Sequence, residues 1–179
     1  FGKKTVAVIG DSTFIHSGIT GLIDIVYNKG NSTVIILDNS ITGMTGHQHN
    51  PTTGYTIKGE STRQVDLVKL SQAVGVERVK VVDPFDLKEF EKTVKEETQA
   101  DEPSVIISQR PCALLKNVKF EGALTINKDK CKKCKLCLSL GCPSIVDKGD
   151  HLEVNEALCV GCKLCTKVCN FDAFEMAGE

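Results

Sequence analysis

The sequence lacks the features by which membrane proteins and nucleic-acid-binding proteins are commonly recognised. No apolar run approaches the roughly 20 residues that span a bilayer, so we expect no membrane segment. The 22 basic and 23 acidic residues give a formal net charge of −1, which argues against a nucleic-acid partner. Residues 1–4 lead directly into a strand pattern and do not resemble a signal peptide. We therefore expect a soluble protein of the reducing cytoplasm.

An initiating methionine is also absent, and the chain opens at Phe1 within a regular pattern, so we expect a piece of a larger protein. Its 179 residues are enough for a domain of about 110 residues with its own core and a second, smaller domain. We place the boundary near Lys116, which predicts domains at residues 1–115 and 116–179.

Eight of the nine cysteines form two runs near the C-terminus, with the spacings C-x2-C-x2-C-x4-C-P and C-x2-C-x2-C-x3-C. The first run holds Cys131, Cys134, Cys137 and Cys142, and the second holds Cys159, Cys162, Cys165 and Cys169. Two such runs in tandem are typical of the ligands of two 4Fe-4S clusters. The sequence therefore predicts a chain that carries electrons.

Each cluster is expected to take its ligands from both runs. Three cysteines spaced by two residues can wrap three corners of a cubane, but a tight loop does not easily bring its own fourth cysteine to the last corner. We assign Cys131, Cys134, Cys137 and Cys169 to cluster 1. We assign Cys142, Cys159, Cys162 and Cys165 to cluster 2.

Zinc knuckles and disulfides are the alternatives for these cysteines. A zinc site usually pairs two short spacings, so a triple run followed by a fourth cysteine has one ligand too many. Disulfides need an oxidising compartment, for which the sequence gives no sign. The ninth cysteine, Cys112, lies outside both runs and fits a small buried residue better than a ligand or nucleophile.

Five lysines surround the first run, namely Lys128, Lys130, Lys132, Lys133 and Lys135. Such a run is most simply a solvated face. Alternatively, its positive charge raises the reduction potential of the nearby cluster or steers an acidic redox partner.

The first two-thirds of the chain alternates between strand and helix patterns. Strands are expected at residues 5–9, 33–37, 78–82 and 104–108, and helices at residues 18–28, 61–73 and 86–98. A polar loop rich in Gly, Thr and Asn is expected at residues 39–59. This alternation predicts an α/β domain with a parallel sheet and helices on both faces. A small α+β domain of the bacterial ferredoxin type is expected to follow it.

Polar residues come directly after the first two expected strands. Ligands of an open parallel sheet bind outside the carboxyl ends of its strands. Asp11 offers a carboxylate oxygen there and Asn39 an amide oxygen, which together suit a Mg²⁺ ion that also binds phosphates. Gly10 and Gly43 allow the backbone to approach a diphosphate, and a helix beginning near Ser17 would point its N-terminus inward. The sequence thus predicts a phosphorylated cofactor with a metal.

These segments also resemble a known signature. Gly10-Asp11-Ser12, followed after 25 residues by Asp38-Asn39, resembles the thiamine diphosphate motif, which begins with G-D-G and ends with N-N. The resemblance implies that Asp11, Asn39 and the backbone carbonyl of Ile41 hold Mg²⁺, and that the backbone at Ser12 lies near the diphosphate. Ser12 and Asp38 depart from the motif, but neither removes a predicted ligand.

The longer strings at residues 10–18 and 37–48 resemble the large subunit of the indolepyruvate ferredoxin oxidoreductase family, in which a two-cluster ferredoxin domain follows the diphosphate-binding domain. Thr45 and Gln48 match steps of that subunit's loop. The resemblance implies that they bind diphosphate or close the pocket; ordinary loop hydrogen bonding is the alternative.

The family's reaction gives a specific expectation of function. It implies thiamine diphosphate-dependent oxidative decarboxylation of an aryl 2-oxo acid to an acyl-CoA, with electrons passed through two 4Fe-4S clusters to ferredoxin. His16, just before the expected helix, is the candidate catalytic residue that orients substrate or relays a proton, and a capping or packing role is the alternative.

The same resemblance implies several partners. They are a pyrimidine-binding part elsewhere in the subunit, a small second subunit, ferredoxin, coenzyme A and the 2-oxo acid. Two other functions stay open: a pyruvate or 2-oxoglutarate oxidoreductase, which shares the cofactor-facing features, and an electron-transfer module on a non-catalytic scaffold.

Overall fold

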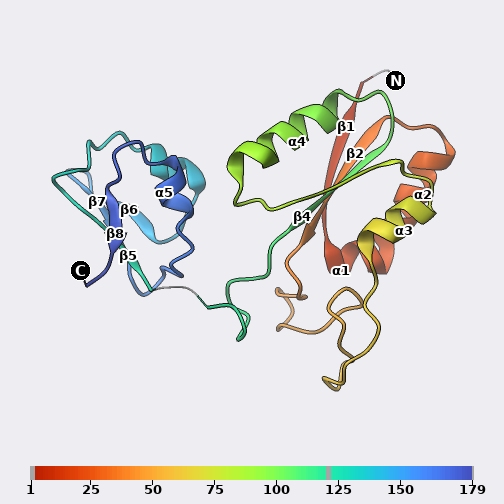
Figure 1. Cartoon of the computed structure of the whole chain (residues 1–179), viewed down its shortest axis with the longest axis horizontal. Helices are drawn as coiled ribbons and strands as arrows, with labels where there is room; N and C mark the ends of the chain where they lie inside the picture. Colours follow the sequence, from red (N-terminus) through yellow and green to blue (C-terminus); the bar gives the residue numbers. More distant parts are fainter. Residues whose placement is uncertain (1–2, 120–121, 179) are drawn as a thin grey trace. The chain divides into compact units, whose positions relative to one another are not determined.

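The computed structural model describes residues 3–119 and 122–178, in two compact units that span Phe1–Cys112 and Ala113–Glu179 (Figure 1). Unit 1 is built on four strands: β1 (Thr5–Gly10), β2 (Ser32–Asp38), β3 (Arg78–Val82) and β4 (Ser104–Gln109). They form one parallel sheet in the order β1-β2-β4-β3. Each strand lies within one residue of its expected position at both ends. Within the described residues, no helix is both long and apolar enough to cross a membrane.

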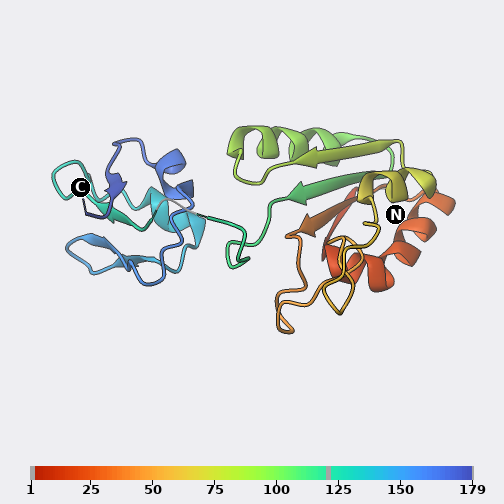
Figure 2. The ribbon, with the colours of Figure 1, turned by 60° about the horizontal axis from the view of Figure 1, so that its bottom comes forward.

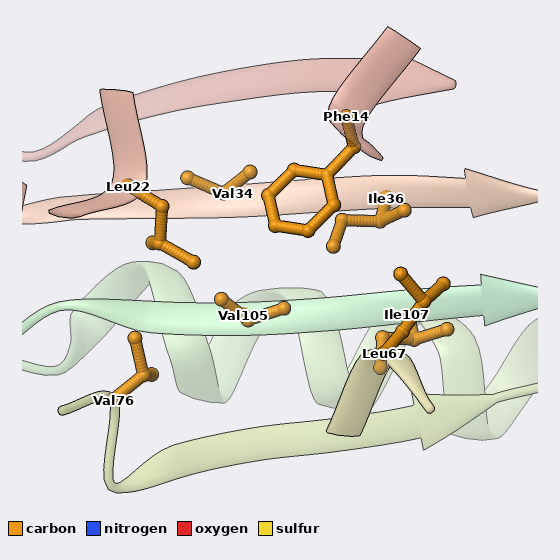
Figure 3. Packing of buried hydrophobic residues seen from close by; sticks show 8 residues of the cluster. All are labelled: Phe14, Leu22, Val34, Ile36, Leu67, Val76, Val105 and Ile107. Atoms are coloured by element: carbon orange, nitrogen blue, oxygen red, sulfur yellow. The ribbon is translucent and has the colours of Figure 1, made fainter. Parts of the chain in front are cut away.

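Helices cover both faces of this sheet, as expected (Figure 2). On one face lie α1 (Asp11–Thr13), the π-helical turn η1 (Phe14–Gly18), α2 (Ile19–Tyr27) and α3 (Leu67–Ala73). Side chains from this layer and the sheet form the main core (Figure 3), which contains Phe14, Leu22, Val34, Ile36, Leu67, Val76, Val105 and Ile107. On the other face, Phe90 and Val94 of α4 (Leu87–Gln99) pack against Ile35 and Ile106. The strands β2 and β4 are apolar on both sides because each side is covered.

The first helical run starts seven residues earlier than expected, at Asp11 instead of Gly18. The side chain of Phe14 is fully buried, and Gly18 lies so close to the sheet that a Cβ there would stand 2.6 Å from Cδ1 of Ile9. The chain therefore turns into a helix directly at the end of β1. A predicted helix N-terminus near Ser17 was wrong, and the run begins beside the predicted Mg²⁺ ligand instead.

The helix expected from Ser61 was also placed wrongly at its start, because α3 begins at Leu67. The carboxylate of Asp66 accepts hydrogen bonds from the backbone N–H groups of Val68 and Lys69 and so caps the helix. The preceding residues continue the long loop, where the N–H of Thr62 donates to the carbonyl of Gly54.

Unit 2 is a small α+β domain, as expected. It contains β5 (Leu124–Ile126), the 3-10 helix η2 (Leu136–Leu140), β6 (Ile145–Asp147), β7 (Leu152–Val154), α5 (Leu164–Val168) and β8 (Phe174–Met176). β5 pairs antiparallel with β8, and β6 with β7. Its core consists of a few apolar side chains packed among the cysteines. So small a core leaves much of the stability to be supplied by bound groups.

Candidate cofactor sites

Asp11 lies at the carboxyl end of β1 and is only 3% exposed. Its Oδ2 atom is 3.1 Å from Nδ2 of Asn50 and 2.9 Å from Oγ1 of Thr52. The Thr52 hydroxyl also lies 2.6 Å from Oδ1 of Asn50, but a carboxylate is the stronger acceptor for its single hydrogen. Among the described residues no hydrogen bond reaches Oδ1 of Asp11. One carboxylate oxygen is thus held in place and the other is left for a ligand.

The loop after β2 brings Asn50 and Thr52 to Asp11. Thr42 and Gln48 exchange two backbone hydrogen bonds of 3.0 and 3.2 Å, which fold the loop back on itself. The amide of Asn50 also lies 3.2 Å from the hydroxyl of Thr42. Because Asn50 and Thr52 are both buried, these polar contacts are shielded from water.

Neither Asn50 nor Thr52 was predicted. They lie 39 and 41 residues after Asp11, and the sequence signal was a polar run on both sides of Pro51 in a loop already rich in such residues. Spacing of this kind cannot be distinguished from ordinary loop polarity without the fold.

Asp38, at the carboxyl end of β2, is buried and fully engaged. Its Oδ1 accepts from the N–H of Ser40 at 2.9 Å, and its Oδ2 accepts from Nε2 of Gln109 at 2.8 Å. Gln109 ends the neighbouring strand β4, with which β2 pairs. Asp38, which stands where the motif has its first Asn, therefore links the carboxyl ends of β2 and β4 by a hydrogen bond.

Asn39 is exposed directly after this tie. Its Oδ1 accepts from the N–H of Ile41 at 3.2 Å, which closes a tight turn. The segment after β4 supports the same turn, because the N–H of Arg110 donates to the carbonyl of Asp38 and the N–H of Cys112 to that of Asn39. Cys112 is partly buried here, beside the turn.

The remaining predicted residues of this site lie around the same edge. Thr45 and Gln48 are exposed and pair with each other, with 2.6 Å between Thr45 Oγ1 and Gln48 Oε1 and a hydrogen bond from the Gln48 amide to the Thr45 carbonyl. Gly43 lies in the same loop. Gly10 is extended, with open space where a Cβ would stand. His16 is exposed on η1, and no hydrogen bond among the described residues joins it to the Asp11 network.

The residues at this edge fit a metal-bound diphosphate. Asp11, Asn39 and the Ile41 carbonyl offer three oxygen donors of the kind that Mg²⁺ prefers. The helical run that starts at Asp11 has no side-chain cap, so its first N–H groups, including that of Ser12, are open to an anion. Across residues 3–119 and 122–178, no group of three or more His, Cys, Asp or Glu side chains is placed to hold a metal ion. The expected Mg²⁺ donors do not form such a group, because only one of them, Asp11, is a carboxylate and the others are an amide oxygen and a backbone carbonyl.

In unit 2 the four thiols of each expected quartet line one cavity, although no three of them in the described residues are arranged to hold a single metal ion. One cavity, of about 20 Å³, is lined by Cys131, Cys134, Cys137 and Cys169. A second, of about 330 Å³, is lined by Cys142, Cys159, Cys162 and Cys165. Each quartet takes three thiols from one run and one from the other, a donor set that fits a 4Fe-4S cluster.

The electrostatics of the thiols follow this grouping. Burial raises the pKa of Cys137, and the neighbouring thiols of Cys131, Cys134 and Cys169 add to the rise. Burial also raises the pKa of Cys165 to about 11, with Cys162, Cys159 and Cys142 adding to it. Binding of iron would therefore have to displace protons from these thiols.

The two runs make the same local turn. Lys135 follows the second cysteine of its run and Lys163 the second cysteine of the other, and both adopt the left-handed conformation, with φ of 62° and 60°. Each lysine precedes a short helix, η2 or α5, that carries the third cysteine. Unit 2 is thus built from two similar halves.

Residues 2–108 match the family model of the thiamine pyrophosphate enzyme, C-terminal TPP binding domain. The chain belongs to this family. Residues 152–175, which include the second cysteine run, match the 4Fe-4S binding domain. Thiamine pyrophosphate and iron-sulfur are therefore supported as its cofactors.

Curated relatives match almost the whole chain. Indolepyruvate oxidoreductase subunit IorA of Pyrococcus abyssi is 39% identical over 188 residues, which cover 99% of this chain and 29% of the relative. The proteins of the same name from Archaeoglobus fulgidus and Methanothermobacter marburgensis are 39% and 33% identical and cover 93% and 99% of this chain, and 28% and 29% of the relatives. The resemblance found in the sequence is confirmed. The chain spans less than a third of the length of these relatives.

A solved structure shares the fold. The 2-oxoglutarate:ferredoxin oxidoreductase from Magnetococcus marinus, with 2-oxoglutarate, coenzyme A and succinyl-CoA bound, superposes with a TM-score of 0.56 at 17% identity, covering 63% of this chain and 42% of that one. At this identity the likeness shows the fold alone, and it confirms the α/β class.

Proposed function

We propose that this chain is the diphosphate-binding and electron-relay part of an oxidoreductase that oxidatively decarboxylates an aryl 2-oxo acid of the indolepyruvate type to an acyl-CoA and passes the electrons to ferredoxin. The observation that carries the proposal is the presence in one chain of the Asp11 network and two cavities that are each lined by four thiols. The relatives named for indolepyruvate support the choice of acid.

In this proposal Asp11 holds Mg²⁺ through its free oxygen, together with the Asn39 amide and the Ile41 carbonyl. Asn50 and Thr52 keep the carboxylate from rotating, which fixes the metal relative to the start of the helix.

The phosphates are proposed to lie against the backbone of Gly10, Ser12 and Gly43, with Thr45 and Gln48 closing over them. The exposed pairing of Thr45 with Gln48 leaves both side chains at the surface of the loop, where a small movement turns them toward a ligand. His16 is the proposed catalytic residue, held by η1 one turn beyond Asp11.

The cofactors supply chemistry that the side chains lack: the thiazolium ring accepts electrons as CO₂ leaves, and iron-sulfur clusters accept electrons one at a time. The protein's part is to bind and orient. We propose one cluster on Cys131, Cys134, Cys137 and Cys169, and a second on Cys142, Cys159, Cys162 and Cys165.

The partners are part of the same proposal. Because the chain covers less than a third of its relatives, the rest of the subunit is proposed to supply the pyrimidine-binding part. A small second subunit is proposed to complete the enzyme, with coenzyme A as the co-substrate and ferredoxin as the electron acceptor.

The test is an anaerobic assay of the whole enzyme with methyl viologen, coenzyme A and a panel of indolepyruvate, phenylpyruvate, pyruvate and 2-oxoglutarate. We expect dye reduction that requires both coenzyme A and an aryl 2-oxo acid. If the dye is reduced with pyruvate or 2-oxoglutarate but not with the aryl acids, the substrate is that smaller acid instead. Asp11→Ala is expected to abolish turnover with the iron content unchanged; full turnover in this variant would leave only the electron-transfer module.

A further inference from the structure

Beside the first thiol quartet, unit 2 has another hollow of about 270 Å³. Lys128, Lys133 and His151 line it, with Asp150. Cys131 lines both this hollow and the cavity of the first quartet. A group seated in the hollow therefore touches the wall of the first cluster's site.

Among the described residues, three lysines in and beside the hollow form no ion pair. Of the five lysines at residues 128–135, Lys130 pairs with Glu175 at 2.7 Å and Lys135 with Asp147 at 2.6 Å. In the described part of the chain no ion pair joins Lys128, Lys132 or Lys133 to an acidic side chain, and all three lysines are exposed.

The acidic groups near these lysines do not cancel their charge. Asp129 is exposed next to Lys128. Asp150 lies 2.8 Å from Nδ1 of His151, and this hydrogen bond, helped by the charge of Lys133, lowers the pKa of Asp150. The carboxylate of Asp150 is therefore already hydrogen-bonded to His151, a side chain that lines the same hollow. A third carboxylate, Glu153, lies 3.9 Å from Nε2 of His151 and 4.0 Å from Nζ of Lys148, so Asp150 and Glu153 both already have partners.

The second quartet presents a different surface. Its cavity is lined mainly by apolar side chains, and two of them are exposed, Leu158 at 52% and Val160 at 37%. Lys163 also lines this cavity. The basic surface is therefore associated with the first quartet, and the apolar surface with the second.

We propose that the hollow lined by Lys128 and Lys133 is the docking site of an acidic one-electron carrier protein, and that the Cys131 quartet is where electrons leave the chain. Positive charge around the hollow steers an acidic partner to it and aligns it there. The step transfers one electron and no atoms: the reduced cluster is oxidised and the carrier is reduced. The inference rests on the proposed function only in taking the first quartet as a redox cluster.

The test uses the whole anaerobic enzyme reduced with dithionite, so that no 2-oxo acid is needed. Its reoxidation is followed by stopped flow with two acceptors, an acidic two-cluster ferredoxin and uncharged benzoquinone. Lys128→Glu and Lys133→Glu are compared with Lys88→Glu, a charge-matched control on the exposed face of α4.

We expect each hollow variant to slow reoxidation by the ferredoxin about tenfold at low salt, with no change for benzoquinone. The difference should shrink at about 0.5 M salt, where exposed charges are screened. Lys133→Gln, which removes one charge without reversing it, should give a smaller loss.

Equal rates for all variants with the ferredoxin, or the same loss in Lys88→Glu, would overturn the proposal. A loss shared by benzoquinone would also overturn it, because the lysines would then be serving the cluster itself. Failure to oxidise any 2-oxo acid in the separate turnover assay would refute the proposed function and leave this result intact.

Discussion

The hydroxyl of Thr52 lies 2.9 Å from Oδ2 of Asp11, although 41 residues separate the two in the chain. Both side chains are almost completely buried. The long polar loop therefore closes directly on the end of the first strand, and the carboxylate proposed to hold Mg²⁺ is fixed from the side opposite its free oxygen.

Thr52→Val is expected to weaken the binding of Mg²⁺ and thiamine diphosphate. Valine keeps the shape of threonine but removes the donor, and a hydrogen bond to a charged group is worth about 1.5–3 kcal/mol. About 1.4 kcal/mol corresponds to a tenfold loss of affinity. The measurement is a calorimetric titration of the whole enzyme with Mg²⁺ in the presence of thiamine diphosphate.

Thr52→Ser is the matched control, since it keeps the hydroxyl and should retain most of the affinity. If valine and serine weaken binding equally, the buried methyl group matters and the hydroxyl does not.

Gln109→Glu should destabilise unit 1, because it puts a second carboxylate 2.8 Å from the buried carboxylate of Asp38. The loss of the hydrogen bond alone is worth about 1–3 kcal/mol. Adding Asp38→Asn should restore stability, since the new amide can donate to the carboxylate introduced by the first substitution. Thermal unfolding of the two single variants and the double variant forms the cycle, and additive effects would show that the two side chains are not coupled.

Cys169→Ser and Cys142→Ser should each remove the cluster of the opposite run. Cys169 lines the cavity of Cys131, Cys134 and Cys137, so its loss should alter the first cluster. Iron analysis should find roughly half of the iron in each variant, and electron paramagnetic resonance of the reduced enzyme should show which of the two clusters has been lost. Cys112→Ser should keep both signals. A Cys169→Ser variant that loses only the second cluster would contradict the crossed assignment.

Gly161→Ala should disrupt unit 2. A Cβ at Gly161 would stand 2.0 Å from the carbonyl oxygen of Gly122, a backbone atom that cannot turn aside. Overpacking of this kind typically costs about 1–3 kcal/mol, in addition to the strain at a φ of +65°. We expect a lower melting temperature and loss of iron.

Gly141→Ala is the matched control, because Gly141 has a φ of +62°, also precedes a quartet cysteine, and has no atom within 4 Å of an added Cβ. It should show only the cost of the left-handed backbone, about 1–2 kcal/mol. Equal effects in the two variants would mean that the backbone conformation, and not the clash, decides.

Sequence patterns were sufficient where the chemistry or the burial is local. The cysteine spacings led us to expect the four thiols that line each cavity of unit 2, and the assignment of these thiols to two clusters stays a prediction. The strands were predictable because β2 and β4 are short apolar runs that are buried on both sides.

The patterns failed where a tertiary contact decides the outcome. The start of the first helix was misplaced because the π-helical turn η1 interrupts the 3.6-residue period that marks a helix. The partners of Asp11 were missed because a loop contact between Asp11 and Thr52 leaves no periodic signal. The buried hydrogen bond of Asp38 depends on Gln109, which lies 71 residues away.

Each half of unit 2 lends one thiol to the cavity of the other. Once iron is bound, this exchange would act as a cross-brace, because each cluster would tie together two stretches of chain that are otherwise held by the β5–β8 pairing and one small shared core. A proteolytic nick in the turn between β6 and β7 should therefore leave the iron-loaded protein in one piece, while the same cut after chelation should release the C-terminal piece from the rest of the chain.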